Sequence, residues 1–502
     1  MRPWRRHAGS LLVVVAFFLA ASLPLAGLLL GFENPSLEKR SLSPLPELLT
    51  DGKPNLRLTR EFEDYYADHF AFRSYLVTAY HRLNQALLGQ SGSGKVLSGR
   101  DGWLFFGETL PDFLAEPVLT DAGLRRLALV LSLQKEYLDS LGIEFLFAVA
   151  PNKNSLYGDR MPDRYRPVRP MNSLALWLAS PLSAAAGDVD LLTPLREAVA
   201  GSDTPLYHRT DSHWNNLGAR VAYQVLMAAA AETAPEDFAY DDYSGVAYET
   251  RTDWEGDLAV MLSPSGVEPE DQQYFDIPQA YRTLRPMRSL EDLRIDTRRL
   301  RPLGDGKGLD LLMFRDSFAN ALIPLLANQF DTATFSREVP YDYRDIDPDT
   351  LDLVLVEIVE RNLSDLLDRA PVLPAPWRTL PEGADGAAAR DLRLEALSVT
   401  VSDGWRKVTG RIGGDPETLD TVGRILIGLS DAAGVIRYVE AFPIDETGDA
   451  AGPAGPAGKT PGEAAGLTAW LPAEDAANLR IVRILYEMGD AWGSLEADLV
   501  LP

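Results

Sequence analysis

Cysteine is absent from the 502 residues of this sequence, and histidine occurs only five times. The lack of cysteine excludes disulfide bonds, thiolate zinc sites and a cysteine nucleophile. The formal charge of −25 argues against nucleic acid as a partner, because binding to a phosphate backbone needs a basic surface. What remains is the composition of an ordinary globular protein, with 46% hydrophobic and 24% charged residues.

The N-terminal segment combines a basic start with a long uncharged stretch. Arginines near the start precede a run from Ser10 to Gly31 that contains no charged side chain. This is close to the ~20 apolar residues that a membrane-spanning helix needs, and basic residues favour the cytoplasmic side. We expect residues 1–31 to be an uncleaved anchor in the inner (cytoplasmic) membrane, with a cleavable signal peptide as the alternative. Both interpretations place the rest of the chain in the periplasm or elsewhere outside the cytoplasm.

The middle of the chain predicts an α/β domain. Residues 32–58 are polar and proline-rich and predict a stalk, and the apolar spacing of residues 58–89 predicts one or two amphipathic helices. Across residues 59–385, apolar strands alternate with helices, which indicates a parallel sheet flanked by helices, with its ligand site at the carboxyl ends of the strands. The segments that we predict to contain strands are residues 143–151, 188–200 (a strand followed by a helix), 309–315, 332–337 and 351–359.

The C-terminal residues 391–502 have a different pattern, in which alternating apolar and polar residues are separated by glycine and aspartate turns. This alternation predicts a separate antiparallel, β-sandwich-like domain. A carbohydrate-binding module is one interpretation, in which Trp405 and Trp492 stack on sugar rings. A structural or assembly domain is the other, since large aromatic side chains in a sandwich usually lie in its core.

Two of the five histidines lie in YHRTDSHWNNLGA, residues 207–219. His213 follows Asp211 by two residues, and imidazole is the usual general base because its ordinary pKa lies near neutrality. We interpret Asp211 as the carboxylate that orients this base, and His208 as a rim or packing residue. A metal-dependent hydrolase that uses the same pair is disfavoured, because too few other histidines are present to complete a metal site.

A partner for this histidine occurs in LDLLMFRDSFANALIP, residues 309–324. Ser317 follows an apolar strand and precedes a predicted helix, so its hydroxyl is expected at the carboxyl end of the strand. The first backbone amides of the helix could stabilise an oxyanion there. The alternative is that Asp316 or Ser317 only caps the helix. The Asp-x-His motif in a neighbouring loop favours catalysis.

These two motifs resemble those of a known family. Asp-Ser-Phe after a strand, with Asp-x-His-Trp elsewhere, is similar to the SGNH-hydrolase-like alginate O-acetyltransferases of the AlgJ and AlgX type and to the related DHHW proteins. Further similar segments are residues 61–73, 99–106, 149–162, 257–262 and 355–363, so the resemblance covers roughly residues 60–365. It implies the circularly permuted SGNH-hydrolase-like fold of this group, with Ser317 as nucleophile, His213 as base and Asp211 as its orienting carboxylate.

The resemblance also implies the activity. It favours an exported O-acetyltransferase that moves acetyl groups to hydroxyls of an extracellular polysaccharide through an acetyl-serine, with a multi-spanning membrane acyltransferase as the acetyl donor. We expect no cofactor and no metal. A carbohydrate acetyl-esterase of the same fold and a non-catalytic polysaccharide-binding or assembly protein remain as alternatives, because the catalytic residues alone do not distinguish transfer from hydrolysis.

Four other residues are candidates for substrate binding. Trp214 is expected either in the wall of the site or in the core. Lys153, Arg209 and Arg315 are each expected on a loop at the carboxyl end of a strand, where they could attract an acidic polymer to this acidic protein. Their alternative role is in surface ion pairs or solubility. Arg315 also occupies the position where the family has glycine, so we assign no second donor to the oxyanion hole.

Overall fold

The computed structural model describes residues 42–50, 52–116, 119–233, 238–287, 292–301, 308–384, 392–444, 464–475, 478–489 and 491–501, together with some positions between 11 and 32. The predicted anchor at residues 1–31 and the predicted stalk at residues 32–58 therefore lie partly outside the described residues. Within these described ranges, no helix combines the length and the apolar character that crossing a membrane requires.

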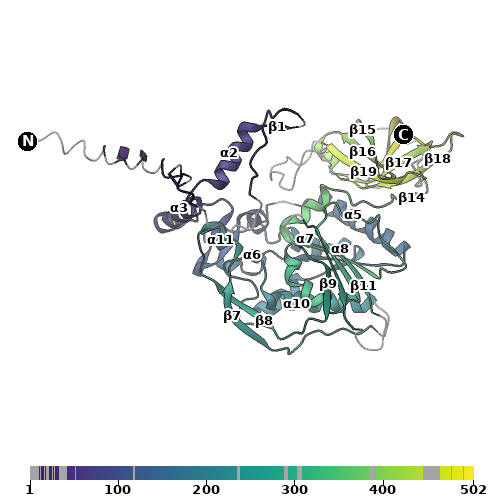
Figure 1. The fold of residues 1–502 in the computed structure, drawn as a ribbon. Helices are drawn as coiled ribbons and strands as arrows, with labels where there is room; N and C mark the ends of the chain where they lie inside the picture. The colour runs from purple at the N-terminus through teal and green to yellow at the C-terminus, as the bar shows by residue number, and fades with distance from the viewer. Residues whose placement is uncertain are drawn as a thin grey trace, which may run out of the picture.

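A seven-stranded sheet forms the centre of the larger region (Figure 1). In order across the sheet, its strands are β6 (Asp188–Val189), β5 (Glu144–Ala150), β13 (Leu353–Val359), β11 (Asp310–Phe314), β12 (Thr332–Ser336), β10 (Arg294–Arg299) and β9 (Tyr281–Arg285). The first five strands run parallel, and each lies in a segment that the sequence predicts to contain a strand. The last two are antiparallel additions at one edge, which the sequence analysis did not predict.

The central strands are continuous apolar runs because both of their faces are covered. All seven residues of β13 are buried. Leu353 and Leu355 point into one hydrophobic cluster, whereas Val354 and Val356 point into another on the opposite face. Each such side chain contributes about 1.5–3 kcal/mol relative to an exposed one. The parallel arrangement therefore follows directly from the apolar segments of the sequence.

Helices cover both faces of this sheet. One cluster includes residues of α10 (Asn216–Thr233) and α12 (Ile323–Ala327), and the other includes residues of α5 (Asp121–Ser140) and α7 (Ser173–Ala179). The segment after β11 was predicted as one helix but is divided into the 3₁₀ turn η4 (Phe318–Ala321) and the short α12. Pro324, in the first turn of α12, explains this division, because proline is tolerated at a helix start but not in its interior.

The other elements of this region lie outside the central sheet. They are β1 (Leu49–Thr50), β2 (Lys53–Pro54), α2 (Leu58–His69), α3 (Arg73–Leu88), β3 (Val96–Ser98), η1 (Arg100–Gly102), β4 (Leu104–Phe106), η2 (Gly107–Thr109), α4 (Leu110–Leu114), α6 (Lys153–Leu156), η3 (Gly158–Arg160), α8 (Pro181–Ala185), α9 (Leu192–Ala200), β7 (Tyr248–Trp254), α11 (Asp257–Leu262), β8 (Glu270–Phe275) and η5 (Glu360–Leu367). The helices α2 and α3 agree with the amphipathic pattern of residues 58–89.

The C-terminal region consists of two antiparallel sheets that share one hydrophobic core. Five strands, in the order β14 (Trp377–Arg378), β18 (Ile436–Ala441), β17 (Val422–Ser430), β20 (Arg480–Met488) and β21 (Ala491–Val500), face three strands, β15 (Arg393–Ser402), β16 (Trp405–Gly413) and β19 (Ala464–Pro472); the short helix α13 (Pro416–Leu419) precedes β17. β14 pairs with β18 although it precedes the predicted domain boundary at residue 385. Trp405 and Trp492 are both half-buried, and Trp492 packs against a small cluster around Tyr438.

Candidate active site

The structure brings Ser317, His213 and Asp211 together at the carboxyl end of the parallel strands. Ser317 lies just beyond β11, and its Oγ is 2.8 Å from His213 Nε2. On the other side of the ring, His213 Nδ1 lies 2.6 Å from Asp211 Oδ1. When Nδ1 carries the proton shared with Asp211, Nε2 is left as an acceptor for the serine hydroxyl. This chain of two hydrogen bonds is the arrangement of a nucleophile, a base and an orienting carboxylate.

Asp316 fixes the turn that presents the serine. Its Oδ1 accepts a hydrogen bond of 2.8 Å from the Phe318 amide, and its Oδ2 accepts one of 2.7 Å from Val359 at the end of β13. Asp316 is thus the capping residue of the turn, which leaves the Ser317 hydroxyl free to reach His213. Because the Phe318 amide is already bound to Asp316, it is not a free oxyanion donor, and an oxyanion donor from this turn would have to be another amide.

The Asp211 carboxylate is saturated with hydrogen bonds. Besides the imidazole, it accepts bonds from the backbone amides of His213 and Asp257, both at 3.0 Å, and from Trp254 Nε1 at 3.1 Å. Burial opposes its charge, but the bonds and positive charge from His213 outweigh this effect and hold the pKa of Asp211 well below its usual range. Asp211 therefore remains a carboxylate and keeps the imidazole in one orientation.

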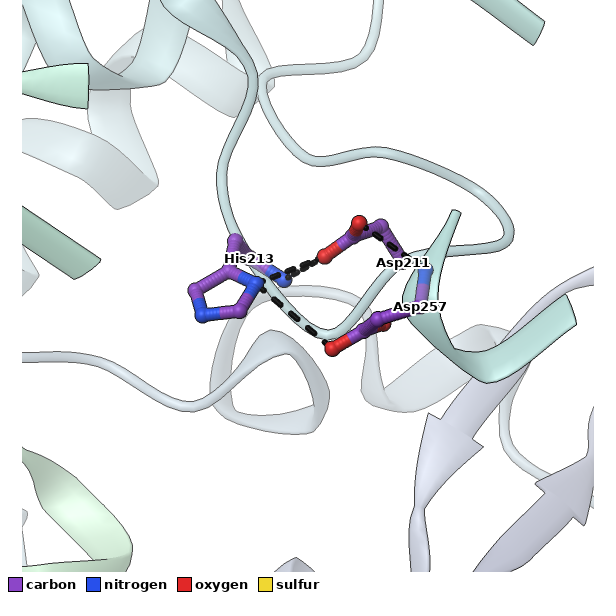
Figure 2. A group of neighbouring side chains, drawn as sticks. All are labelled: Asp211, His213 and Asp257. Atoms are coloured by element: carbon purple, nitrogen blue, oxygen red, sulfur yellow. Dashed lines mark hydrogen bonds and ion pairs between the residues drawn. The ribbon is translucent and has the colours of Figure 1, made fainter. Parts of the chain in front are cut away.

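A second carboxylate, Asp257, was missed by sequence reasoning. Its Oδ2 lies 3.7 Å from His213 Nδ1, and its two oxygens accept bonds of 2.7 and 2.5 Å from the amide and hydroxyl of Ser212. Figure 2 shows both aspartates on the same side of the ring. Gly256 allows this approach, because a Cβ there would lie 2.4 Å from the Thr210 carbonyl. In sequence, an aspartate at the start of the short α11 indicates no more than a helix cap.

The two aspartates set the proton affinity of His213. Burial by itself lowers the pKa of the imidazole, but the hydrogen bond and charge of Asp211, helped by the charge of Asp257, raise it above its ordinary value. Burial and the neighbouring Asp211 raise the pKa of Asp257. Ligand atoms of these three residues lie within 4.8 Å of one another, as a metal site would require. A metal bound through Nδ1 would have to replace the proton that already joins His213 to Asp211, so the group fits a hydrogen-bonded pair better.

Trp214 is a buried side chain and not an open wall of the site. Its Nε1 donates a bond of 2.9 Å to the Phe318 carbonyl, and its ring meets the Phe318 ring edge-on, with centroids 5.1 Å apart. The Phe318 ring in turn lies 4.8 Å from the His213 ring. Trp214 therefore holds the serine turn against the histidine loop.

The sequence led us to expect Lys153 at the surface, where it could attract an acidic polymer, but the structure buries it. Its side chain is buried, with 3% exposure for the residue, and Nζ donates bonds to the carbonyls of His208 (3.1 Å), Arg209 (3.2 Å) and Asp211 (2.6 Å). The ammonium also lies 5.5 and 5.1 Å from the ring centroids of Trp103 and Phe105. Burial lowers the pKa of Lys153 to about 8, although nearby carboxylates partly oppose this effect. Its place is beneath the loop that carries Asp211 and His213.

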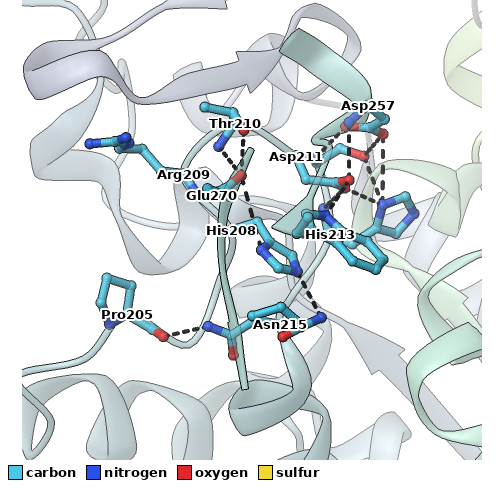
Figure 3. A network of polar contacts seen from close by, with 12 residues as sticks. Pro205, His208, Arg209, Thr210, Asp211, His213, Asn215, Asp257 and Glu270 are labelled. Carbon is cyan, nitrogen blue, oxygen red and sulfur yellow. Dashed lines mark hydrogen bonds and ion pairs between the residues drawn. The ribbon is translucent and has the colours of Figure 1, made fainter. Parts of the chain in front are cut away.

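Glu270 supports the same loop from the β7–β8 hairpin. It accepts bonds from the amides of Arg209 (2.7 Å) and Thr210 (2.9 Å). His208 is buried with its ring stacked on Trp254, at 4.7 Å and an angle of 3°, and burial lowers its pKa to about 4. His208 is therefore a neutral packing residue and not a second base. Figure 3 shows Glu270 and His208 on the side of the loop away from the catalytic ring.

The other two cations that we predicted to bind substrate, Arg209 and Arg315, do not point toward an acceptor at Ser317 either. Arg209 is exposed, and Figure 3 shows its guanidinium pointing away from His213. Arg315 is buried, and its Nη1 donates to the Asp316 carbonyl (3.0 Å) and to Asn320 Oδ1 (2.6 Å). Burial lowers the pKa of Arg315 to about 10, which still leaves it charged near neutral pH. Arg315 braces the serine turn where the family has glycine.

A cation that the sequence analysis did not single out lies nearer to the catalytic pair. The guanidinium carbon of Arg361 lies 5.3 Å from the ring centroid of Phe106 and 5.6 Å from that of Phe318, the residue after the serine. Arg361 is only half-buried, and within the described part of the chain it has no hydrogen-bond or ion-pair partner. Only the folded structure shows this, because the arginine follows β13 by two residues and reads as a surface residue in sequence.

Comparisons with known proteins agree with the family resemblance. Residues 96–289 match the family model described as SGNH hydrolase-like domain, acetyltransferase AlgX, a range that includes Asp211 and His213 but ends before Ser317. The chain is similar to "Probable alginate O-acetylase AlgJ" of Pseudomonas aeruginosa, with 31% identity over 237 residues, or 47% of this chain and 58% of that protein. The protein of the same name from Pseudomonas syringae pv. tomato is 29% identical over 208 residues, or 41% and 51% of the two chains.

Among solved structures, the O-acetyltransferase domain of Pseudomonas putida AlgJ is 22% identical, with a TM-score of 0.35, and the match covers 54% of this chain and 92% of that one. By contrast, the sequence matches to the two proteins named probable alginate O-acetylase span only about half the length of those curated relatives. The family match over residues 96–289 confirms the resemblance at the level of the SGNH-like domain.

Proposed function

We propose that this protein is a serine O-acetyltransferase that moves acetyl groups onto hydroxyls of an extracellular polysaccharide. One observation carries the proposal: the hydrogen bond of 2.8 Å from Ser317 to His213 Nε2, continued at 2.6 Å from Nδ1 to Asp211. The relatives named for alginate O-acetylation support acetyl transfer and, by analogy, a polysaccharide acceptor. No metal or cofactor takes part in the proposed steps.

In the first half-reaction, His213 Nε2 takes the Ser317 proton as Oγ attacks the carbonyl carbon of an acetyl ester. The tetrahedral intermediate collapses when the bond to the donor oxygen breaks, and His213 returns the proton to that oxygen. Asp211 stabilises the imidazolium formed between these events, since it stays ionised. The product is an acetyl ester on Ser317 and a free donor hydroxyl.

In the second half-reaction, neutral His213 takes a proton from an acceptor hydroxyl, whose oxygen attacks the acetyl-serine. Protonation of Ser317 Oγ then releases the acetylated acceptor. Water in place of the sugar would make the same protein an acetyl-esterase, so the outcome depends on acceptor binding and on water exclusion. The half-buried guanidinium of Arg361 makes no hydrogen bond among the described residues, although its charge acts on the carboxyl groups of Asp112, Glu357 and Asp365. Its free N–H groups beside Phe318 support an acceptor with acidic groups.

The location and partners that we propose follow the same analogy. The chain is exported and held by residues 1–31 at the inner membrane, and the acetyl group comes from a multi-spanning membrane acyltransferase. We assign residues 59–385 to the catalytic domain, except for β14 (Trp377–Arg378), which pairs with β18 of the C-terminal region. For the β-sandwich-like domain at residues 391–502 we propose carbohydrate binding.

A direct test uses the full chain with a chromogenic acetyl ester, with and without an acidic oligosaccharide. We expect release of the chromophore, a mass increase of one acetyl group on the peptide that contains Ser317, and acetylated oligosaccharide when the acceptor is present. The His213→Ala variant is the control for all three signals. Acetate without acetylated sugar would identify an esterase, and the absence of acetyl-serine and turnover would favour the non-catalytic alternative.

A further inference from the structure

Helix α3 has its amphipathic faces reversed relative to an ordinary surface helix. The side that packs on the body is polar: Ser74 and Thr78 are buried, and Thr78 Oγ1 lies 2.9 Å from Ser265 Oγ. Further along this side, His81 Nδ1 lies 2.5 Å from the Ser91 carbonyl. A surface helix of a soluble domain normally turns its apolar stripe inward. The polar contacts inward imply that the apolar residues of α3 lie on the other side.

The outer face carries a continuous apolar stripe. Its residues follow the helical spacing of three and four, and their exposed fractions are 41% for Leu76, 56% for Tyr80, 58% for Leu83 and 71% for Leu87. Isolated exposed apolar residues are normal, but a row of four on one helix face marks an interaction surface.

The charge of α3 indicates what kind of partner covers its apolar face. The helix contains Arg73 and Arg82 but neither aspartate nor glutamate, in a chain with a net charge of −25. Exposed leucine and tyrosine beside arginine are typical of a helix that lies in the interface of a bilayer, where basic groups meet lipid phosphates.

The residues next to α3 also indicate contact with a bilayer. The uncharged run from Ser10 to Gly31 leads directly to Phe32, whose ring lies 4.0 Å from Phe72 and 6.2 Å from Tyr75 at the start of α3. Figure 1 shows α3 on the side of the molecule that the N-terminal segment approaches. An apolar segment and an outward apolar helix face therefore adjoin each other.

We propose that the outer face of α3 lies in the surface of a phospholipid bilayer, with Leu76, Tyr80, Leu83 and Leu87 among the acyl chains and Arg82 at the headgroups. This interaction does not depend on the proposed acetyl transfer. It has a consequence for that function, because α3 contacts α11, and α11 begins with Asp257 beside His213. Lipid contact would give the catalytic centre a fixed orientation to the membrane.

The absence of cysteine allows a local test in the full chain. Two single variants, Leu83→Cys on the stripe and Val401→Cys on β15, each receive one environment-sensitive fluorophore; Val401 is 54% exposed and serves as the matched control. Both proteins are reconstituted into phosphatidylcholine vesicles that contain phosphatidylglycerol and nitroxide-labelled lipid. Because the N-terminal segment is the same in both variants, its insertion attaches both proteins to the vesicles equally, and the comparison measures how deeply each label lies in the lipid.

We expect the label at position 83 to be quenched several-fold more strongly by nitroxide lipid than the label at position 401, and to be less accessible to aqueous iodide. In vesicles of phosphatidylcholine alone, this contrast should decrease, since Arg82 loses its anionic partners. Equal iodide quenching at both positions would overturn the proposal. Shielding of position 83 from both quenchers would also overturn it, because that result identifies a protein and not lipid as the occupant.

A second pair of variants tests the stripe without a label. Leu83→Glu combined with Leu87→Glu should weaken membrane retention after alkaline carbonate washing, whereas Val401→Glu should not. Hydrolysis of a small acetyl ester in detergent should be the same in all three proteins and shows that they are folded. Unchanged retention of the double variant would contradict the contribution of this face.

Discussion

The Nζ atom of Lys153 donates a hydrogen bond of 2.6 Å to the carbonyl oxygen of Asp211, two residues before His213. Two more carbonyls of the same loop, those of His208 and Arg209, take the remaining N–H groups of the ammonium, which has three in all. Burying a lysine is costly, and these three carbonyls with the rings of Trp103 and Phe105 offset the cost. The loop that orients the catalytic base is therefore fixed by a buried cation.

We expect Lys153→Met to lower kcat/KM for a small acetyl ester by about 100-fold, because a shift of ~1 Å in a catalytic group costs roughly this much. Lys135→Met is the matched control, since Lys135 forms only an exposed pair with Asp139. Near-ultraviolet circular dichroism reports whether the variant is folded. A folded Lys153→Met protein with full activity would contradict a positioning role.

The same lysine predicts an alkaline limit of activity. Burial lowers the pKa of Lys153 to about 8, so the ammonium is charged and hydrogen-bonded below this pH and loses its proton as the pH rises through it. We expect kcat/KM of the wild-type protein to decline above about pH 8. The Lys153→Arg variant, whose side chain stays protonated, should lose this decline even if its overall activity is low. A wild-type profile that stays flat to pH 10 would count against this assignment.

The catalytic group should behave as one unit. Ser317→Ala and His213→Ala should each remove most activity, and the double variant should be scarcely slower than either single one, because the two residues act in the same step. Rates of acetyl-ester cleavage for the four proteins check this. Losses that multiply in the double variant would mean that the two side chains act independently.

Asp211 should determine the acidic limit of activity. Its hydrogen bond and charge raise the pKa of His213, whereas burial lowers it. Only neutral His213 can act as a base, so activity is lost as the pH falls through this pKa. Asp211→Asn removes the negative charge of Asp211 and leaves at most a weaker, neutral hydrogen bond to the imidazole, so the acidic limb of kcat/KM should move to lower pH while the maximum falls. Asp257→Asn should move the limb in the same direction by less, since Asp257 contributes through charge alone.

The parallel part of the sheet could be predicted because strands buried on both faces are continuous apolar runs, as in β5 and β13. The strands β9 and β10 could not, because YRTLR and RIDTRR are polar segments without a continuous apolar run. Their pairing with β12 and with each other depends on the rest of the sheet.

The candidate site was predictable where a motif contains the chemistry, as for Ser317 and His213. Asp257 was not, because its role depends on the approach of Gly256 to Thr210. The place of Lys153 was not predictable either. The sequence predicts a loop there, whereas Lys153 begins the short helix α6, and only the folded chain supplies the three carbonyls that hold its buried ammonium.

Replacing Arg361 should weaken acetyl transfer to an acidic polymer but leave hydrolysis of a small ester nearly unchanged. If its guanidinium binds an acidic group of the acceptor, Arg361→Gln should raise the KM for an acidic oligosaccharide about tenfold, since a charge-assisted hydrogen bond contributes ~1.5–3 kcal/mol. Cleavage of a small neutral acetyl ester should change little. The difference in KM between the wild-type protein and Arg361→Gln should shrink at high salt, because interactions between exposed charges are screened within ~8 Å already at physiological ionic strength.

Arg220→Gln is the matched control, because Arg220 also lies over a phenylalanine ring, that of Phe275, but on α10. Arg209→Gln tests the expectation from the sequence, and its outward orientation predicts no effect on transfer. If Arg361→Gln lowers transfer and ester hydrolysis equally, the arginine supports the geometry of Phe318 and the serine turn. If only Arg209→Gln weakens transfer, the acceptor crosses the outer side of the histidine loop, and the polymer path lies away from Phe106.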